Sequence, residues 1–346
     1  MVRCEPGAAL PYTLFVLSLI SMVAAGGFLL SWLELRSGQA YAAGVDAFYV
    51  SDGALQETLA RMTGSPPPSQ TVSLGPGQAT VTSTRLLHLG YGESLHRILS
   101  IGTLNAPRGE TFARTVGVVA WVAEPPLLPA ALTVAGSLSG GAASGTVTGM
   151  DASSACGRYP GSVAGVSLPA GAPLMVGPGL QLSGSPTVQT YTPGTTLRQV
   201  TGLDWPGLVS AFGPHRDATI PPDPWPTASF ARPGAWPVIE VRSSPALLDS
   251  RHSGMGALIV LGDLEISGGF SWRGLILVGG ALRVLGVAML GGAAIVGLDS
   301  TAASIPLVDL GSHRVDIRFD SCAVEAAASK IAPHPVPEPG TWHEVL

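Results

Sequence analysis

Charged residues are scarce in this chain: Asp, Glu, Lys and Arg make up only 12% of its 346 residues, about half of their share in an average soluble domain. Aromatic residues are also few, at 6%. The exterior must therefore be built largely from Ser, Thr, Gly and Ala, which favours a β-rich protein outside the cytoplasm over a cytoplasmic enzyme. The net charge of −5 and the lack of any Lys/Arg cluster argue against a nucleic-acid partner.

Sequence motifs of the common enzyme classes are missing. The chain has no Gly-x-Ser-x-Gly elbow, Walker loop or His-Glu-x-x-His, and its seven histidines are scattered. Asp263 and Glu265 share one face of an expected strand and could serve a glycosidase or lyase, but such enzymes need carboxylates that converge on a cleft. Asp299 and Asp309 lack the loop of a calcium site. We therefore expect no enzyme activity, no cofactor and no metal.

A membrane-length apolar segment dominates the N-terminus. A short polar leader, Met1–Gly7, precedes an uncharged run from Ala8 to Leu33. A helix of about 26 residues is roughly 39 Å long, more than the roughly 30 Å hydrocarbon core of a bilayer. The glycine that suits cleavage comes before the apolar run rather than after it, unlike the site in a secretory signal peptide. We expect a single transmembrane helix over about 8–33, with Arg3 favouring a cytoplasmic N-terminus; an uncleaved signal-anchor helix is the alternative.

The helical pattern continues beyond the membrane segment. Gly64 and the prolines that follow it end the helix, so we expect one helix over 8–63. Its second half should dock on a globular head through an apolar face with spacings of three, four and seven residues. The residues of that face are Tyr41, Val45, Phe48, Leu55, Leu59 and Met62.

Two segments of this helix resemble a known family. The sequence from Gly7 to Leu17, GAALPYTLFVL, and the later AFYVSDGALQE of 47–57 resemble the N-terminus of PilX-type minor pilins of type IV pili, and also the K-type minor pseudopilin of general secretion systems. The resemblance implies cleavage between Gly7 and Ala8 by a prepilin peptidase and N-methylation of Ala8. It implies an inner-membrane location before assembly, a periplasmic or extracellular head, and partnership with other major and minor pilins in a pilus or pseudopilus.

One residue departs from the pilin pattern. Major pilins carry glutamate at the fifth mature position, where this chain has Tyr12. Tyrosine removes both the charge and its pairing with a neighbouring N-terminal amine, so the resemblance implies a tip or initiating subunit. Gly26 and Gly27 in mid-span lower helix stability by about 1 kcal/mol each relative to alanine. They mark either a place where the helix can unwind or a surface for close helix packing.

Cysteine is rare as well, with three residues in the chain. Cys4 would leave with the leader, which leaves Cys156 and Cys322 as an even pair in an oxidising compartment. A disulfide between them and two buried free thiols are the alternatives, because spacing along the sequence does not fix the distance between the Cα atoms.

The rest of the chain is β-rich, so the expected fold class is α+β. Alternating residues over 70–125 predict an antiparallel β segment of the head. Residues 129–322 predict a β-helix-like domain, because segments that begin at Gly256, Gly274 and Gly292 repeat about every 18 residues; a β-meander is the alternative. A Pro/Gly-rich insertion over 157–242 should wrap this domain as irregular loops with a short helix near 205–212. Residues 323–346 should form a short helix and an extended tail.

Three tryptophans mark the insertion, Trp205, Trp225 and Trp236. They either cap the ends of the β domain or anchor a partner. Two functions remain in view: a minor pilin or pseudopilin at or near a filament tip, and a membrane-anchored β-helix protein that acts on or binds surface polysaccharide.

Overall fold

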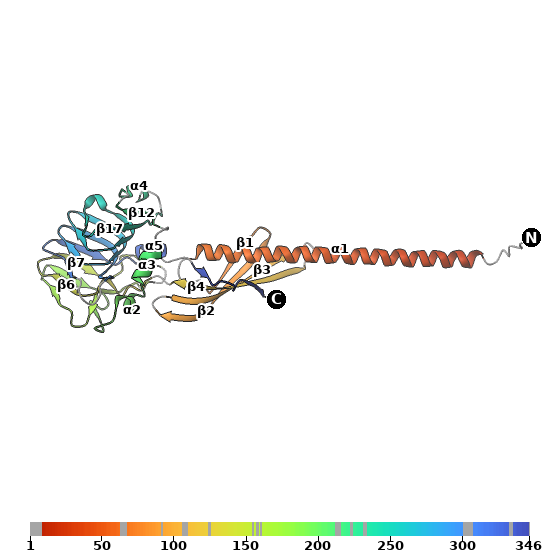
Figure 1. The fold of residues 1–346 in the computed structure, drawn as a ribbon, viewed down its shortest axis with the longest axis horizontal. Coiled ribbons are helices and arrows are strands. Elements are labelled where there is room, and N and C mark those ends of the chain that lie inside the picture. Colours follow the sequence, from red (N-terminus) through yellow and green to blue (C-terminus); the bar gives the residue numbers. More distant parts are fainter. Residues whose placement is uncertain are drawn as a thin grey trace, which may run out of the picture.

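The chain folds into a long helix, a small sheet beside its second half, and a larger β body beyond it (Figure 1). The fold is seen in a computed structural model. The leader, with Gly7 and Ala8, lies outside the described residues. These are 9–62, 68–90, 93–105, 110–123, 126–153, 156, 159, 161–211, 216–221, 224–230, 234–299, 307–331 and 335–345.

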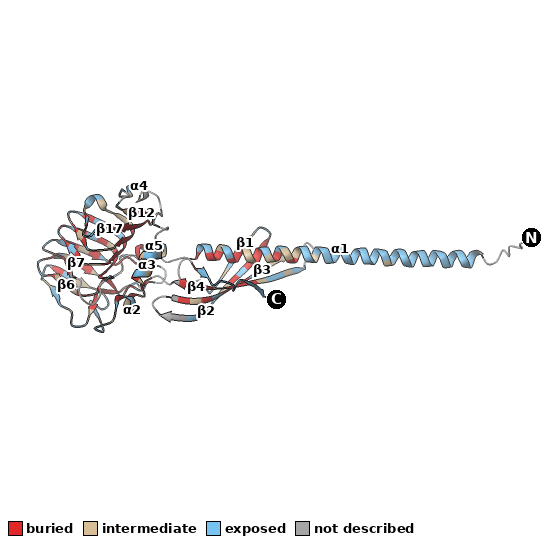
Figure 2. Cartoon of the chain, in the orientation of Figure 1, coloured by how far each residue is buried: buried red, intermediate tan, exposed pale blue. Residues whose placement is uncertain are grey.

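The first element is a single helix, α1 (Ala9–Arg61), of 53 residues, which is about 80 Å long. Figure 2 shows that its first half is exposed all round, whereas one face of its second half is buried. The long apolar helix predicted from the sequence is thus confirmed.

The second half of α1 lies on an antiparallel sheet of four strands, with the order β1-β2-β3-β4. The expected antiparallel segment over 70–125 corresponds to these strands. The C-terminal tail returns to the same sheet, where its two short strands pair antiparallel with β4. The strands are β1 (Ser69–Leu74), β2 (Gly77–Gly90), β3 (Glu93–Asn105), β4 (Thr111–Ala123), β22 (Val336–Pro337) and β23 (His343–Val345).

Small residues let the helix approach the sheet closely. A Cβ atom added to Gly102 on β3 would collide with the backbone oxygen of Ala47 and the backbone nitrogen of Ser51. The Ser51 hydroxyl donates a hydrogen bond of 2.6 Å to the backbone oxygen of Ser100. The buried helix face therefore follows Ala47, Ser51, Leu55 and Leu59, and every other residue of β4, from Val116 to Val122, packs against it.

The predicted helix face needs one correction. Leu55, Leu59 and Met62 are buried as expected, but Tyr41 is 76% exposed. The sheet begins to cover the helix near Gly44, where an added Cβ atom would lie 3.3 Å from the Arg114 guanidinium. Tyr41 precedes this point, so the apolar pattern of the helix begins before its contact with the sheet.

The larger β body contains two sheets of parallel strands. Their orders are β10-β7-β21-β19-β17-β15-β13-β12, with β5, β8 and β11 branching from β19, and β14-β16-β18-β20-β6-β9. The strands are β5 (Ala130–Val134), β6 (Ser137–Gly140), β7 (Ser144–Thr148), β8 (Ala164–Pro169), β9 (Leu174–Val176), β10 (Leu180–Ser183), β11 (Val188–Tyr191), β12 (Ala218–Ile220), β13 (Val238–Val241), β14 (Ala246–Leu248), β15 (Gly254–Val260), β16 (Leu264–Ile266), β17 (Phe270–Val278), β18 (Leu282–Val284), β19 (Ala288–Val296), β20 (Leu307–Asp309) and β21 (Arg314–Arg318). The helices are α2 (Leu197–Thr201), α3 (Trp205–Ala211), α4 (Thr227–Phe230), the 3-10 turn η1 (Ser250–His252) and α5 (Ser321–Ile331).

The 18-residue repeat in the sequence corresponds to the pairing register of the parallel strands β15, β17 and β19. Gly256 pairs with Gly274, and Gly274 with Gly292, so equivalent residues stand 18 positions apart. All three have positive φ, of 117°, 129° and 151°. A Cβ on Gly274 would collide with the carbonyl oxygen of Gly256, and a Cβ on Gly292 with that of Gly274. Beyond this bend β19 changes neighbours: Ala288–Gly291 pair with β21, and Ala294–Val296 with β5.

The order of the strands differs from the order of the chain. The strands β5, β6 and β7 begin the body in sequence, yet they pair with β19, β20 and β21, which end it. The stretch over 157–242 is not simply an insertion of loops, since it supplies β8 to β13. Its strands have only three to six residues, too short to give a readable period between glycines and prolines. The helix expected near 205–212 is present as α3.

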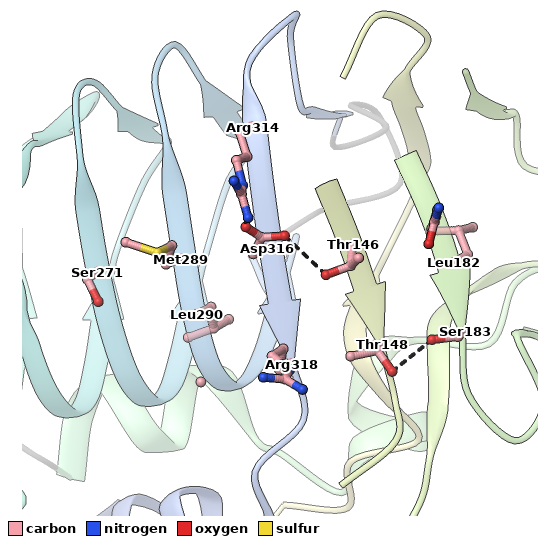
Figure 3. Close-up of a pocket in the computed structure, with 12 residues that line it drawn as sticks. Thr146, Thr148, Leu182, Ser183, Ser271, Met289, Leu290, Arg314, Asp316 and Arg318 are labelled. Carbon is pink, nitrogen blue, oxygen red and sulfur yellow. Dashed lines mark hydrogen bonds and ion pairs between the residues drawn. The ribbon is translucent and has the colours of Figure 1, made fainter. Parts of the chain in front are cut away.

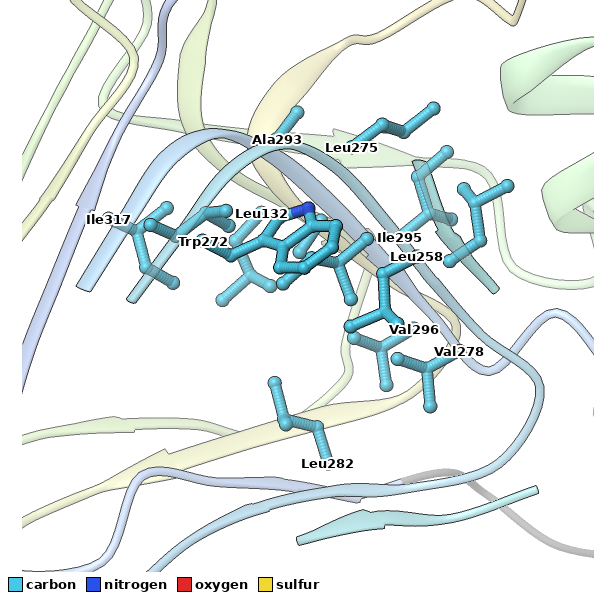
Figure 4. Packing of buried hydrophobic residues seen from close by; sticks show 14 of the residues in the cluster. Leu132, Leu258, Trp272, Leu275, Val278, Leu282, Ala293, Ile295, Val296 and Ile317 are labelled. Atoms are coloured by element: carbon cyan, nitrogen blue, oxygen red, sulfur yellow. The ribbon is translucent and has the colours of Figure 1, made fainter. Parts of the chain in front are cut away.

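Side chains from facing strands fill the inside of the body. Figure 3 shows five neighbouring strands from the outside, with Ser271, Met289, Asp316, Thr146 and Leu182 on successive strands. Figure 4 shows the inside, where Trp272 lies among aliphatic side chains such as Leu132 and Leu258. The indole nitrogen of Trp272 donates a hydrogen bond of 3.1 Å to the backbone oxygen of Gly256, so this fully buried ring leaves no polar atom unsatisfied.

Candidate functional site: the exposed half of the N-terminal helix

The first half of α1 is apolar and exposed on all sides. Its large side chains are exposed all round the helix rather than along one stripe, and a helix that is apolar all round requires lipid or other helices as its surroundings. The most exposed of these side chains are Leu10, Tyr12, Leu14, Phe15, Leu17, Met22, Val23, Phe28, Leu30 and Leu35.

This half has the length and composition of a membrane span. It belongs to the one helix, among the described residues, that is long and apolar enough to cross a membrane. Three of its hydroxyls are satisfied within the helix: those of Thr13, Ser18 and Ser21 donate to the backbone oxygens of the preceding turn at 2.8–2.9 Å. Such bonds let a hydroxyl group enter hydrocarbon without an unpaired donor.

Charged groups mark the end of the apolar half. The Arg36 guanidinium carbon lies 5.5 Å from the centroid of the Trp32 ring. The guanidinium also forms an ion pair of 3.0 Å with Glu110, just before β4. Both charged side chains are about half exposed, so the pair adds only about 0–1 kcal/mol of stability. It nevertheless indicates where the helix passes from its apolar half to the sheet.

Tyr12 and the glycine pair lie on this exposed half. Tyr12 is 70% exposed, and it stands where the pilin resemblance expects a carboxylate. Gly26 and Gly27 are helical, and nothing lies within 4 Å of a Cβ added to either. Any close packing through these two glycines must therefore come from another molecule. The predicted cleavage and methylation sites, Gly7 and Ala8, lie outside the described residues.

The two remaining cysteines meet in the β body. Cys156 and Cys322 form a disulfide with their Cα atoms 4.8 Å apart, across 166 residues of sequence. Beside it, the Ser321 hydroxyl accepts a hydrogen bond of 3.0 Å from the Cys156 backbone nitrogen and donates one of 2.5 Å to Asp151. The Ser153 hydroxyl also donates to Asp151, at 3.1 Å. The disulfide and this polar network join the segment after β7 to the start of α5.

The network changes the acidity of Asp151. Burial raises the pKa of this carboxyl, but hydrogen bonds from the side chain and backbone of Ser321, and from Ser153, outweigh burial and lower the pKa below its usual value. The ionised carboxylate is therefore the form that the fold stabilises.

Other candidate residues have structural partners. The Glu265 carboxylate lies 3.7 Å from the Arg283 guanidinium on the neighbouring strand β18, and Asp263 accepts a hydrogen bond of 2.7 Å from the Ala281 backbone nitrogen. Asp309 accepts one of 3.0 Å from Gly311 within a turn. In the described part of the chain, no group of three or more His, Cys, Asp or Glu side chains is placed to hold a metal ion.

The three tryptophans pack onto the β body. Trp205 is buried, Trp225 lies edge-on to Trp272 with ring centroids 6.1 Å apart, and Trp236 lies 5.9 Å from the Arg273 guanidinium carbon. All three tryptophans therefore pack against the protein's own β body, two of them against residues of β17.

Sequence reasoning did not foresee how the C-terminal tail attaches. The Trp342 indole nitrogen donates a hydrogen bond of 3.1 Å to the Asp52 carboxylate on α1. The Trp121 indole nitrogen donates one of 2.7 Å to the Glu338 carboxylate. The alternation in a run as short as β23 is too brief to predict a strand, and the acids that accept from the two indoles lie more than two hundred residues away in the sequence.

Comparison with known proteins adds one weak likeness. No protein-family model and no curated protein matches the sequence. Among solved structures, the chain aligns with the crystal structure of the competence-associated pilin ComZ from Thermus thermophilus at 12% identity and a TM-score of 0.30, covering 88% of this chain and 97% of that one. At such a score the proposal that follows depends on the geometry of this chain alone.

Proposed function

We propose that this protein is a structural subunit of a type IV pilus or a related secretion filament, and specifically a minor pilin or pseudopilin. The observation that carries the proposal is α1, a single helix whose first half is apolar and exposed while its second half is docked under an antiparallel sheet. A span that only anchors the chain could end at the bilayer. Here the same rigid helix continues into the core of the head, so a movement of the span moves the head with it.

The free energy of assembly comes from the apolar half of the helix. Before assembly this half lies in the inner membrane, with the head on the periplasmic side. In the filament, helices of other pilins replace lipid around it, and close approach at Gly26 and Gly27 increases the packing contacts.

The proposed processing and position follow from the N-terminal residues. A prepilin peptidase cleaves between Gly7 and Ala8, and the new amine of Ala8 is methylated. Tyr12 offers no carboxylate to the N-terminal amine of a neighbouring subunit. A subunit that lacks this ion pair suits a tip or initiating position, where no neighbour lies ahead, better than the shaft.

The β body extends the head as a β-helix-like solenoid. The parallel register of 18 residues and the glycine bends support this description. We propose no catalytic role for it, because Asp263 and Glu265 are engaged in hydrogen bonding and ion pairing within the stack.

N-terminal mass analysis of the protein from cells with and without a prepilin peptidase tests the proposal. We expect a mature chain that begins at methylated Ala8 only when the peptidase is present. Gly7→Leu should abolish cleavage, whereas Gly38→Leu, at a helix position with open space around its Cα, should leave it intact. Retention of Met1 to Gly7 in peptidase-containing cells would overturn the proposal.

A further inference from the structure

The outer surface of the β body contains a hollow of about 650 Å³. It lies across the five parallel strands β17, β19, β21, β7 and β10 (Figure 3). None of these strands carries a catalytic or assembly role proposed above.

The hollow exists because one strand has no side chain at its centre. In one row across the strands, Arg273 pairs with Gly291, Gly291 with Arg318, and Arg318 with Thr148. The Cα atoms of Arg273 and Arg318 are thus about 10 Å apart, two strand spacings, with only Gly291 between them. A Cβ on Gly291 would meet nothing closer than the Arg273 Cγ, at 3.8 Å, so the space above this glycine is open.

The charge of the hollow is opposite to that of the whole chain. Arg314 and Arg318 line it with the single carboxylate of Asp316, whereas the chain carries −5. Asp316 is held by the Arg314 guanidinium at 2.7 Å and by the Thr146 hydroxyl at 3.1 Å. Arg318 is exposed and, among the described residues, its side chain has no hydrogen bond or ion pair. One planar guanidinium is therefore left to bind an outside carboxylate.

Neutral polar groups complete the lining. The Ser183 hydroxyl donates a hydrogen bond of 2.8 Å to the Thr148 hydroxyl. Gln181 and Ser271 lie at the two ends of the next row across the strands, which also contains Asp316. Thr148 and Ser183 lie on adjacent strands, about 4.8 Å apart, and Gln181 is two residues before Ser183 on β10. Met289, which is 48% exposed, adds an apolar patch within the same hollow.

We propose that this hollow binds an acidic glycan, with a uronic-acid carboxylate on Arg318 and sugar hydroxyls on Thr148, Ser183 and Gln181. No aromatic side chain lines the hollow, so it lacks the stacking platforms on which single-stranded nucleic acid depends. The strands that form its centre are paired on both sides, which leaves no free edge there to bind an extended peptide backbone. Side-chain hydroxyls and a guanidinium remain, and these match a hydroxyl-rich polyanion.

Binding measurements on the full chain in detergent micelles test this inference. The probes are oligogalacturonate, neutral dextran and poly-glutamate. We expect saturable binding of oligogalacturonate that weakens with added salt and is much stronger than binding of dextran or poly-glutamate. Loss of a charged hydrogen-bond partner in Arg318→Gln should lower the affinity about tenfold or more.

Two further variants separate the site from general effects of charge or folding. Gly291→Phe fills the hollow from a position with open space and should lower the affinity at least as much. Arg283→Gln removes a similarly exposed arginine from the other parallel sheet and should leave the affinity unchanged. The inference is overturned if oligogalacturonate does not bind, if poly-glutamate binds equally well, or if all three variants bind alike. The outcome does not depend on filament assembly, because N-terminal processing is not involved.

Discussion

Removal of the disulfide should destabilise the β body strongly. The bond between Cys156 and Cys322 closes a loop of 166 residues, and in the chain-entropy model a cross-link of that length stabilises the folded state by about 5 kcal/mol at 25 °C. For a domain of this size, such a loss corresponds to a decrease in Tm of about 10–20 °C. The Cys156→Ser, Cys322→Ser double variant should show it, because the bonds from Ser321 and Ser153 to Asp151 survive the change.

Urea unfolding followed by tryptophan fluorescence is a suitable assay. Trp205, Trp225, Trp236 and Trp272 all belong to the β body, so the signal reports mainly on this part of the chain. In protein that retains the leader, Cys4→Ser serves as the matched control and should unfold like the wild type. Dithiothreitol should shift the wild-type transition to that of the double variant and leave the double variant unaffected. A difference below about 1 kcal/mol would refute the reasoning, because the unfolded chain would then gain little freedom from losing the cross-link.

Three further predictions concern the helix and the network around the disulfide. Gly102→Val should separate α1 from the sheet and lower the midpoint of thermal unfolding monitored at Trp121 and Trp342, whereas Gly141→Val, in open space, should not. Gly26→Ala together with Gly27→Ala should stabilise the helix by about 1 kcal/mol per residue, seen as higher helicity by circular dichroism in micelles; unchanged helicity would contradict this. Because the folded-state pKa of Asp151 is lowered, its carboxylate contributes stability above the unfolded-state pKa of about 3.9, and this contribution is lost as the pH falls through the folded-state value. The stability difference between wild type and Asp151→Asn in urea should therefore shrink below about pH 4, and a difference that is constant with pH would argue against it.

The sequence predicted those elements that one continuous segment or one regular repeat specifies. The uncharged run from Ala8 to Leu33 predicted the exposed half of α1, because length and hydropathy alone decide whether a helix suits a membrane. The glycines 256, 274 and 292 predicted the register of the parallel strands, because each bends its strand at the same place in the repeat.

The pairing of strands that are far apart in the chain could not be predicted from the sequence. Nothing local to Ala130–Val134 indicates that β5 lies against β19, because strand order depends on contacts between residues far apart in the chain. The hollow was missed for the same reason, since Arg273, Gly291 and Arg318 become neighbours only through the register. Tyr41 was assigned to the buried face because the apolar period does not reveal where the sheet begins.

The return of the tail to β4 has a mechanical consequence. The chain leaves β4 at Ala123 and re-enters the sheet at β22, where Val336 pairs with Trp121, so the β body is attached through two adjacent strands. Tension applied to the body pulls both strands in the same direction and does not peel one from the other. The load passes to the long β3–β4 ladder and to the α1 helix beneath it, so a force on the β body would reach α1 without separating β22 from β4.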